Sequence, residues 1–412
     1  MSNTTVTREG LNREFLPHII PLSAFSGFLS ITGFVGNVIV FYVYLLKYPV
    51  CNFRYFVLYL SAIDIVCCTV VIPGEILTQV HWFVYHTPQI CTAKSFFQNA
   101  AVTATSSGLF LIAVDRFLKV RSPLGRQITP SCARILTIVF FIVACIVASP
   151  MIYLSGEHNS VKTVNGTSVN VTQCEEKSQY KNSTWIGIYT KYCYVTPNSV
   201  CMGLTIVLYI FIGTALMQRK KAASSVCCES NNEVGRNRAI YNIHQHFLLL
   251  NRNHNETELT ETSFSNTNGT TETVERSSAV NCAPKATSSK TAVRKTCASR
   301  DEKSLYMKRT MWKTKLLRQT LITFLVTILF VATVVIYQVY LLKLRYTYTY
   351  LQELDDLGAI TFLVSNSMFF INCVINPFLY GFLDRRFQKI IKESGLRLSG
   401  SIRRLRQRVV RK

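Results

Sequence analysis

Seven long apolar segments dominate this sequence of 412 residues. A helix needs about 20 apolar residues to cross the bilayer core, and each segment meets that requirement. Because lipid offers no hydrogen-bond partner to the backbone, a helix is the default structure for such a segment. The segments cover residues 19–46, 55–80, 95–119, 133–154, 193–218, 317–342 and 357–383. We therefore predict an all-α membrane protein, a bundle of seven transmembrane helices.

The distribution of basic residues predicts the orientation of this bundle. Lys and Arg are enriched in cytoplasmic loops, and most of the 45 in this chain lie inside when the amino terminus is placed outside. The formal net charge of +23 is then explained by topology and by contact with anionic membrane lipids. A nucleic-acid partner would need a soluble basic domain, and none is visible, so we expect no nucleic-acid binding. The predicted location is the plasma membrane, with the carboxyl terminus in the cytoplasm.

Polar segments flank and interrupt the bundle. We expect an extracellular amino-terminal segment (1–18), the bundle (19–383) and an amphipathic helix with a basic cytoplasmic tail (384–412). Within the bundle, residues 219–315 are rich in Ser, Thr, Asn, Lys and Arg, which predicts a long disordered cytoplasmic loop. Acceptor motifs predict glycans on the outer side, and two further motifs on the inner side should stay unmodified. The outer motifs are at Asn3, Asn165, Asn170 and Asn182, and the inner ones at Asn255 and Asn268.

Two motifs mark the third and seventh segments. Cys91 and Arg116 lie 25 positions apart, and a helix between them covers about 37 Å, enough to cross a bilayer. Asp115 precedes that arginine, and Pro123-Leu124 follow it in a basic loop. The seventh segment ends Asn376-Pro377-Phe378-Leu379-Tyr380. After it, Leu383, Phe387, Ile390 and Ile391 recur at helical spacing, which predicts a short amphipathic helix on the membrane surface.

In order and membrane depth, these motifs resemble those of rhodopsin-like (class A) G protein-coupled receptors over most of the chain. The resemblance implies a receptor that activates a heterotrimeric G protein, with arrestin as a further partner and no enzymatic activity. It implies that Asp115 holds Arg116 at rest, and that on activation Arg116 turns toward Tyr209 and Tyr380. The other residues of this switch would be Pro123, Leu124, Asn376 and Pro377. It also implies a disulfide between Cys91 and Cys174, for which Cys193 is the competing partner.

A second set of polar residues lies at mid-membrane around Asp64. An intramembrane carboxylate is costly unless it has partners, so it marks a functional site or a polar staple between helices. The resemblance implies a sodium ion or a water cluster there. The residues that could point at Asp64 are Asn37, Thr105, Asn372 and Asn376. Cys373 stands where the family has a serine.

The sixth segment departs from the family pattern Phe-x-x-Cys-Trp-x-Pro. Phe330 is present, but Val334 and Ile336 occupy the positions of the Trp and the Pro. The hinge of this helix is usually attributed to that proline. The departure motivates an alternative function, a seven-helix orphan or decoy with constitutive or no G protein coupling.

The third segment also bears on the ligand. Gln98 stands where amine receptors carry an aspartate, and a glutamine there resembles peptide receptors. We predict a pocket for a small basic neuropeptide, with the ligand cation on Glu75 and its backbone amides on Gln98 and Asn366. The remaining pocket residues would be Val102, Tyr337 and Gln338. In the alternative interpretation, Glu75 pairs with Lys94 of the same chain.

Overall fold

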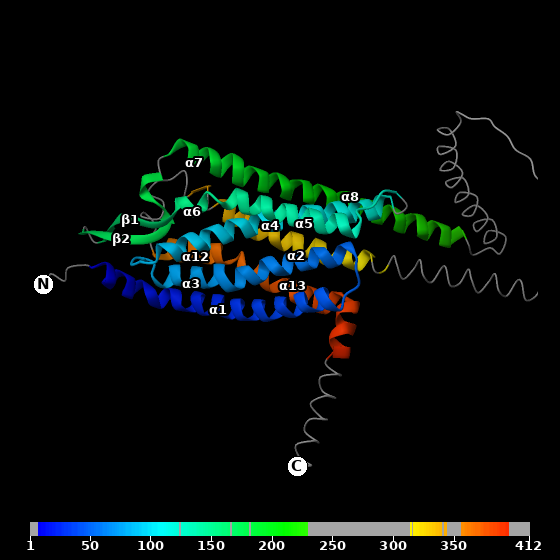
Figure 1. Cartoon of the computed structure of the whole chain (residues 1–412), viewed down its shortest axis with the longest axis horizontal. Helices are drawn as coiled ribbons and strands as arrows, with labels where there is room; N and C mark the ends of the chain where they lie inside the picture. Colours follow the sequence, from blue (N-terminus) through cyan, green and yellow to red (C-terminus); the bar gives the residue numbers. More distant parts are fainter. Residues whose placement is uncertain are drawn as a thin grey trace, which may run out of the picture. The chain divides into compact units, whose positions relative to one another are not determined.

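The structure of the chain is a computed structural model that describes residues 7–122, 125–164, 167–180, 183–229, 314, 316–339, 342–343 and 356–394. Within these ranges, seven helices are long and apolar enough to cross a membrane. They are Arg8–Leu46, Asn52–Val80, Pro88–Arg121, Pro130–Leu154, Thr184–Gln218, Leu316–Val339 and Asp356–Leu383. The predicted seven-helix fold is confirmed (Figure 1).

Several spans consist of more than one element. The first and third are the single helices α1 (Arg8–Leu46) and α4 (Pro88–Arg121). The second joins α2 (Asn52–Val66) to α3 (Ile72–Val80), the fourth joins α5 (Pro130–Ala148) to α6 (Met151–Leu154), and the fifth joins α7 (Thr184–Ile188) to α8 (Thr196–Glu229). The seventh joins α12 (Asp356–Ser367) to α13 (Phe370–Leu383), and a short helix follows at 385–394.

Two spans contain π-helical turns, Cys67–Val71 and Tyr189–Val195. Each turn ends two residues before a proline, Pro73 or Pro197. Proline lacks the N–H that an α-helix requires and clashes with the carbonyl of the preceding turn, so a wider turn accommodates it. The turns therefore follow from the prolines and set the direction of α3 and α8.

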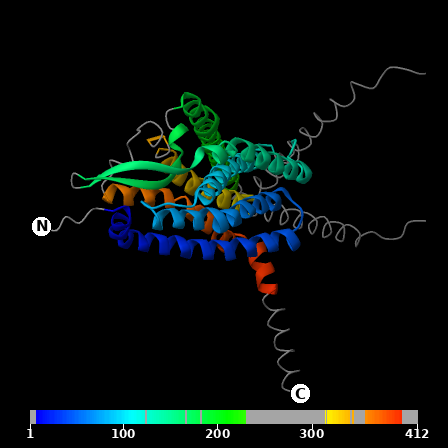
Figure 2. The ribbon, with the colours of Figure 1, turned by 60° about the vertical axis from the view of Figure 1, so that its left-hand side comes forward.

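One element was not predicted, a two-stranded antiparallel hairpin formed by β1 (Ser155–Val164) and β2 (Thr167–Glu176). Its register places Ser155 opposite Glu176 and Glu157 opposite Cys174. The strands carry few large apolar residues, so no apolar pattern in the sequence marked them. Figure 2 shows the hairpin at the end of the bundle where α1 begins. We call this the hairpin end, and the opposite end, near Arg116, the Arg116 end.

The first helix begins at Arg8, well before the apolar segment at residue 19. The Thr7 hydroxyl caps it by accepting a hydrogen bond from the Gly10 N–H at 3.1 Å. Most of the expected amino-terminal segment (1–18) is therefore helical, which corrects that boundary. The extension is buried at Leu11, Phe15 and Ile19 in a small core with Trp82, Phe83, Val169, Val171, Ala359, Phe362 and Leu363. This core ties the extension to the hairpin and to α12.

The chain divides into two compact units. One unit, Met1–Ile212 with Thr314–Lys412, contains the bundle and its main apolar core. In the other, Gly213–Lys313, the described part is the continuation of α8 to Glu229. The start of the predicted loop 219–315 is therefore helical, and the rest of that prediction lies almost entirely outside the described residues.

Candidate functional site

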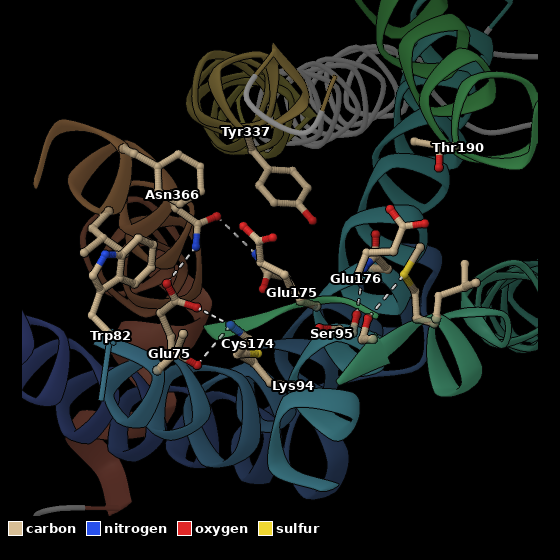
Figure 3. Close-up of a pocket in the computed structure, with 18 of the residues that line it drawn as sticks. Glu75, Trp82, Lys94, Ser95, Cys174, Glu175, Glu176, Thr190, Tyr337 and Asn366 are labelled. Atoms are coloured by element: carbon tan, nitrogen blue, oxygen red, sulfur yellow. Dashed lines mark hydrogen bonds and ion pairs between the residues drawn. The ribbon is translucent and has the colours of Figure 1, made fainter. Parts of the chain in front are cut away.

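A cavity of about 190 Å³ opens at the hairpin end of the bundle (Figure 3). Its walls come from α3, α4, α12, the sixth span and β2. Four of the six predicted pocket residues line it: Glu75, Gln98, Tyr337 and Asn366. The other described charged residues in its wall are Lys94, Glu175 and Glu176.

The two other predicted pocket residues lie elsewhere. Val102 is fully buried in the main apolar core. Gln338 is buried and accepts a hydrogen bond from the Ser199 hydroxyl at 3.0 Å. Neither side chain lines the cavity. Val102 follows Gln98 by four residues, so it lies on the same face of α4 one turn deeper, beyond the cavity. Gln338 directly follows the lining residue Tyr337, so its side chain points in a different direction around the helix.

A chain of hydrogen bonds crosses one wall of the cavity, centred on Glu75. Lys94 Nζ lies 2.9 Å from Glu75 Oε2 and donates a second bond to Thr78 Oγ1 at 3.2 Å. Asn366 Nδ2 donates to Glu75 Oε1 at 2.8 Å, and Gln98 approaches Asn366 Oδ1 at 3.5 Å. The Glu75 side chain is 2% exposed and that of Lys94 10%. The Lys94–Glu75 pair of the alternative interpretation is therefore present, and a ligand cation on Glu75 stays a prediction.

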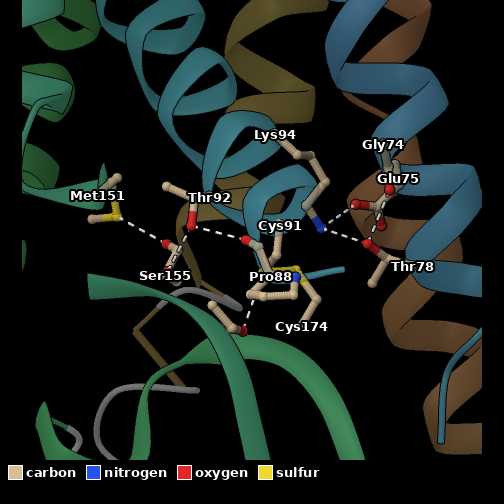
Figure 4. The surroundings of a disulfide bond; sticks show 11 residues. Gly74, Glu75, Thr78, Pro88, Cys91, Thr92, Lys94, Met151, Ser155 and Cys174 are labelled. Carbon is tan, nitrogen blue, oxygen red and sulfur yellow. Dashed lines mark hydrogen bonds and ion pairs between the residues drawn. A yellow bond between two sulfur atoms is a disulfide. The ribbon is translucent and has the colours of Figure 1, made fainter. Parts of the chain in front are cut away.

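The disulfide holds the hairpin over this cavity. Cys91 on α4 is bonded to Cys174 on β2, as the resemblance implied, and the competing Cys193 is free and exposed. A further hydrogen bond joins Thr92 Oγ1 to the Ser155 carbonyl at 2.9 Å (Figure 4). Together these links place the end of β2, with its two glutamates, in the cavity wall.

At the Arg116 end, the same helix α4 presents a buried charged group. Asp115 Oδ2 lies 2.8 Å from Arg116 Nη2 and 2.7 Å from Lys119 Nζ. Asn52 Nδ2 donates to Asp115 Oδ1 at 2.6 Å. The sequence indicated the Asp115–Arg116 pair but gave no sign of the additional donors Asn52 and Lys119. The two hydrogen bonds from Lys119 and Asn52 and the ion pair with Arg116 compensate the carboxylate more completely than the ion pair alone would.

The guanidinium group of Arg116 is almost completely buried, 1% exposed. It donates to Gln319 Oε1 on the sixth span at 3.1 Å and lies over the ring of Phe53. Tyr209 packs against Phe324, and Tyr380 against Tyr44 and Phe53. Among the described contacts, no hydrogen bond joins Arg116 to either tyrosine. Pro123 and Leu124, predicted to contact the G protein, lie outside the described residues.

The mid-membrane cluster is only partly assembled as predicted. Asn376 Nδ2 donates to Asp64 Oδ2 at 2.8 Å, and the Cys373 thiol is also within hydrogen-bonding reach of Asp64. Asn37 instead donates to the Cys373 carbonyl at 2.6 Å, and Asn372 to Thr333 on the sixth span at 2.6 Å. For Thr105, which is buried, the described contacts include no hydrogen bond to Asp64.

The side chains around Asp64 therefore match the polar staple more closely than a built cation site. A thiol is a soft ligand, and sodium is a hard ion that prefers oxygen. Within the described residues, no group of three His, Cys, Asp or Glu side chains is placed to hold a metal ion. The sodium ion stays a prediction from the resemblance, and nothing below depends on it.

The family model described as 7 transmembrane receptor (rhodopsin family) matches residues 36–380. The chain belongs to this family. It is therefore a multi-pass membrane receptor that signals through G proteins and is not an enzyme, as the sequence predicts. No curated protein matches the chain.

The receptor also contains a buried polar group at the Arg116 end that sequence reasoning missed. Asp384 Oδ2 accepts from the hydroxyls of Tyr44 and Tyr48 at 2.7 and 3.0 Å. Its other oxygen accepts from the backbone N–H groups of Arg386 and Phe387, which caps helix 385–394. Burial, with the nearby Asp384 carboxylate, raises the pKa of Tyr48, so its phenol stays a donor. An aspartate just before the amphipathic pattern was the available signal.

Proposed function

We propose that this receptor binds an extracellular peptide in the hairpin-end cavity and activates a heterotrimeric G protein at the Arg116 end. The observation that carries the proposal is the arrangement of one helix. Helix α4 contributes Lys94 and Gln98 to the cavity and, one membrane thickness away, Asp115 and Arg116 to a buried charged group. In this proposal the amino terminus and the hairpin are extracellular, the carboxyl terminus is cytoplasmic, and the receptor lies in the plasma membrane.

A peptide fits the chemistry of the cavity wall. Gln98 and Asn366 offer amide groups, which pair with backbone amides. Three carboxylates and one ammonium group are the described charges that line the cavity, so the wall favours a basic ligand. The attraction of such a ligand is long-range, and its potency should fall with added salt. Glu75 has its own cation in Lys94, and the two other carboxylates of the wall are Glu175 and Glu176 on β2.

The Arg116 end supports the switch. In the present arrangement, Arg116 is held by the Asp115 carboxylate and by Gln319 of the sixth span. In the proposal, movement of the sixth span away from α4 removes the Gln319 contact and frees Arg116 to turn toward Tyr209 and Tyr380. Pro123 and Leu124 would then contact the G protein. Asn376 and Pro377 would transmit the change along α13.

A second candidate function is a seven-helix receptor without ligand-regulated coupling. The observation that favours it is the sixth span, where Val334 and Ile336 replace the family's Trp and Pro. Val334 is fully buried in the core, and the span runs from Leu316 to Val339 without a proline. Without that proline, a swing of the sixth span lacks its usual hinge.

A peptide-library screen that reads calcium and cyclic nucleotide together tests the proposal. A basic peptide should give a saturable signal in cells that express the receptor and none in untransfected cells. Gln98→Ala and Asn366→Ala should weaken its potency, while Tyr192→Ala, on the exposed face of the fifth span, should not. If every active ligand is acidic, or if no peptide alters either signal, the peptide proposal is wrong and the second candidate gains support.

A further inference from the structure

Lys94 is the most informative residue in the cavity, because its hydrogen bonds are incomplete. An ammonium group has three N–H donors. Glu75 and Thr78 accept two of them (Figure 4). Among the residues that the structure describes, none accepts the third, and Lys94 lines the cavity. A buried donor without an acceptor costs free energy, so this N–H favours a ligand that brings one.

Glu75 is, by contrast, fully engaged. One carboxylate oxygen accepts from Lys94 and the other from Asn366. With its side chain 2% exposed, it offers little surface to an incoming cation. The Thr78 hydroxyl is also engaged, because it donates to the Gly74 carbonyl at 2.9 Å and accepts from Lys94. Glu75 therefore acts as an internal counter-ion that keeps the Lys94 ammonium charged and in place.

We infer that the subsite at Lys94 recognises a neutral carbonyl group of the ligand, best a carboxamide, and that Glu75 is not the seat of a ligand cation. A carboxylate would also accept from Lys94, but this ammonium already has Glu75 as its counter-ion, so a second anion beside it would be repelled by Glu75. A carboxamide avoids this repulsion. Lys94 and Gln98 lie four residues apart on one face of α4, so the amide N–H groups can reach the Gln98 side chain.

This inference rests on the proposed function only in assuming that the ligand of the cavity is the signal that activates the receptor. A binding measurement can therefore test it without any G protein readout. The probes are L-phenylalaninamide, L-phenylalanine and phenethylamine, which share one aromatic ring and one amine. They differ only in carrying a carboxamide, a carboxylate or no carbonyl group. Saturation-transfer NMR on the full-length receptor in nanodiscs, with millimolar probe, would rank their affinities.

We expect phenylalaninamide to bind more tightly than either of the other probes. Loss of a charge-assisted hydrogen bond weakens binding roughly tenfold to a hundredfold, and phenethylamine should show that loss. The Lys94→Met variant should lose most of the preference for phenylalaninamide over phenethylamine and keep only the part that Gln98 contributes. Because an unpaired Glu75 can destabilise that variant, the double variant Lys94→Met/Glu75→Gln serves as its neutral counterpart and should behave identically. Lys191→Met removes a cation from the exposed start of the fifth span and should keep the preference.

Equal affinity of the wild type for phenylalaninamide and phenethylamine would overturn the inference, and so would the absence of saturable binding by phenylalaninamide. An undiminished preference in Lys94→Met/Glu75→Gln would also overturn it, because the carbonyl group would then be recognised elsewhere. If the receptor prefers phenylalaninamide but activates no G protein, the proposed function is wrong and this inference stands. If the receptor activates a G protein but shows no preference for phenylalaninamide, this inference is wrong and the proposed function stands.

Discussion

At the scale of single residues, Asp115 is the centre of the buried charged group on α4. Its carboxylate forms an ion pair with Arg116 at 2.8 Å and accepts hydrogen bonds from Lys119 and Asn52 at 2.7 and 2.6 Å. Two cations and one amide stabilise this buried carboxylate, and removing its charge leaves them with a weaker partner. The resting position of Arg116 therefore depends on this one residue and on Gln319.

Asp115→Asn should raise ligand-free signalling several-fold, because the neutral amide holds the guanidinium group less tightly. The measurement is GTP-analogue binding in membranes, normalised to the amount of receptor at the surface. Glu9→Gln, at the opposite end of the bundle and 61% exposed, is the matched loss of a carboxylate and should leave the signal unchanged. Identical ligand-free signals from Asp115→Asn and the wild type would contradict this role.

Gly36 shows a different constraint, close helix contact. An added Cβ would lie 2.9 Å from two atoms of the Pro377 ring, and neither the ring nor α1 can easily give way. Gly36→Ala should therefore lower the free energy of unfolding by about 1–3 kcal/mol, the usual cost of inserting an extra methyl group into a packed core. Gly203→Ala is the matched control, because nothing lies within 4 Å of its added Cβ, and it should be neutral or slightly stabilising. A thermal unfolding assay with a thiol-reactive fluorescent dye measures the midpoint temperature of each variant. Equal midpoints for Gly36→Ala and Gly203→Ala would contradict this constraint.

At the scale of elements, the long apolar runs were predictable, and the hairpin and the amino-terminal helical turns were not. Runs of apolar residues determine the spans because each must satisfy its own backbone in lipid. Leu11, Phe15 and Ile19 do recur at helical spacing, but their partners Trp82 and Val171 are distant in sequence. Packing between residues that are distant in sequence stabilises these elements, and the pattern of residues within one segment does not reveal such contacts.

The cavity illustrates the same difference at the level of the site. Gln98 was predicted from its place in the family pattern, whereas the Lys94–Glu75 pairing was one of two open interpretations. Only the relative rotation of α3 and α4 places the ammonium 2.9 Å from the carboxylate. Gln338 was predicted to line the pocket but accepts a hydrogen bond from Ser199. The segment that carries a pocket residue was predictable from sequence, and the rotation of its helix was not.

The hairpin should depend on its disulfide as a unit. Cys91→Ala and Cys174→Ala should each cause the same loss of surface expression, and the double variant should be no worse, because both remove one bond. Loss of a native disulfide typically costs about 2–5 kcal/mol. Cys193→Ala removes a free exposed thiol and should be neutral. Additive losses at Cys91 and Cys174 would indicate separate partners.

At the scale of the whole molecule, the orientation in the membrane links the two ends of α4 to their functions. With the hairpin outside, enzymatic deglycosylation should shift the mobility of the receptor through Asn165, Asn170 or Asn182. Asn170 is exposed on β2, where a glycan is accessible. Gln substitutions at these three positions should reduce the shift to the part that a glycan at Asn3 contributes, and Gln substitutions at Asn255 and Asn268 should leave the shift unchanged. A glycan on either of the last two would contradict the orientation.

The central claim is that Arg116 converts a change in the bundle into G protein activation. Nucleotide exchange on a panel of purified heterotrimeric G proteins, with the receptor in nanodiscs, measures this directly. Asp115→Asn supplies ligand-independent activity, so no ligand needs to be known. Adding Arg116→Ala should return exchange to the level of empty nanodiscs while the folded fraction stays unchanged. Equal exchange by Asp115→Asn and Asp115→Asn/Arg116→Ala would contradict the claim.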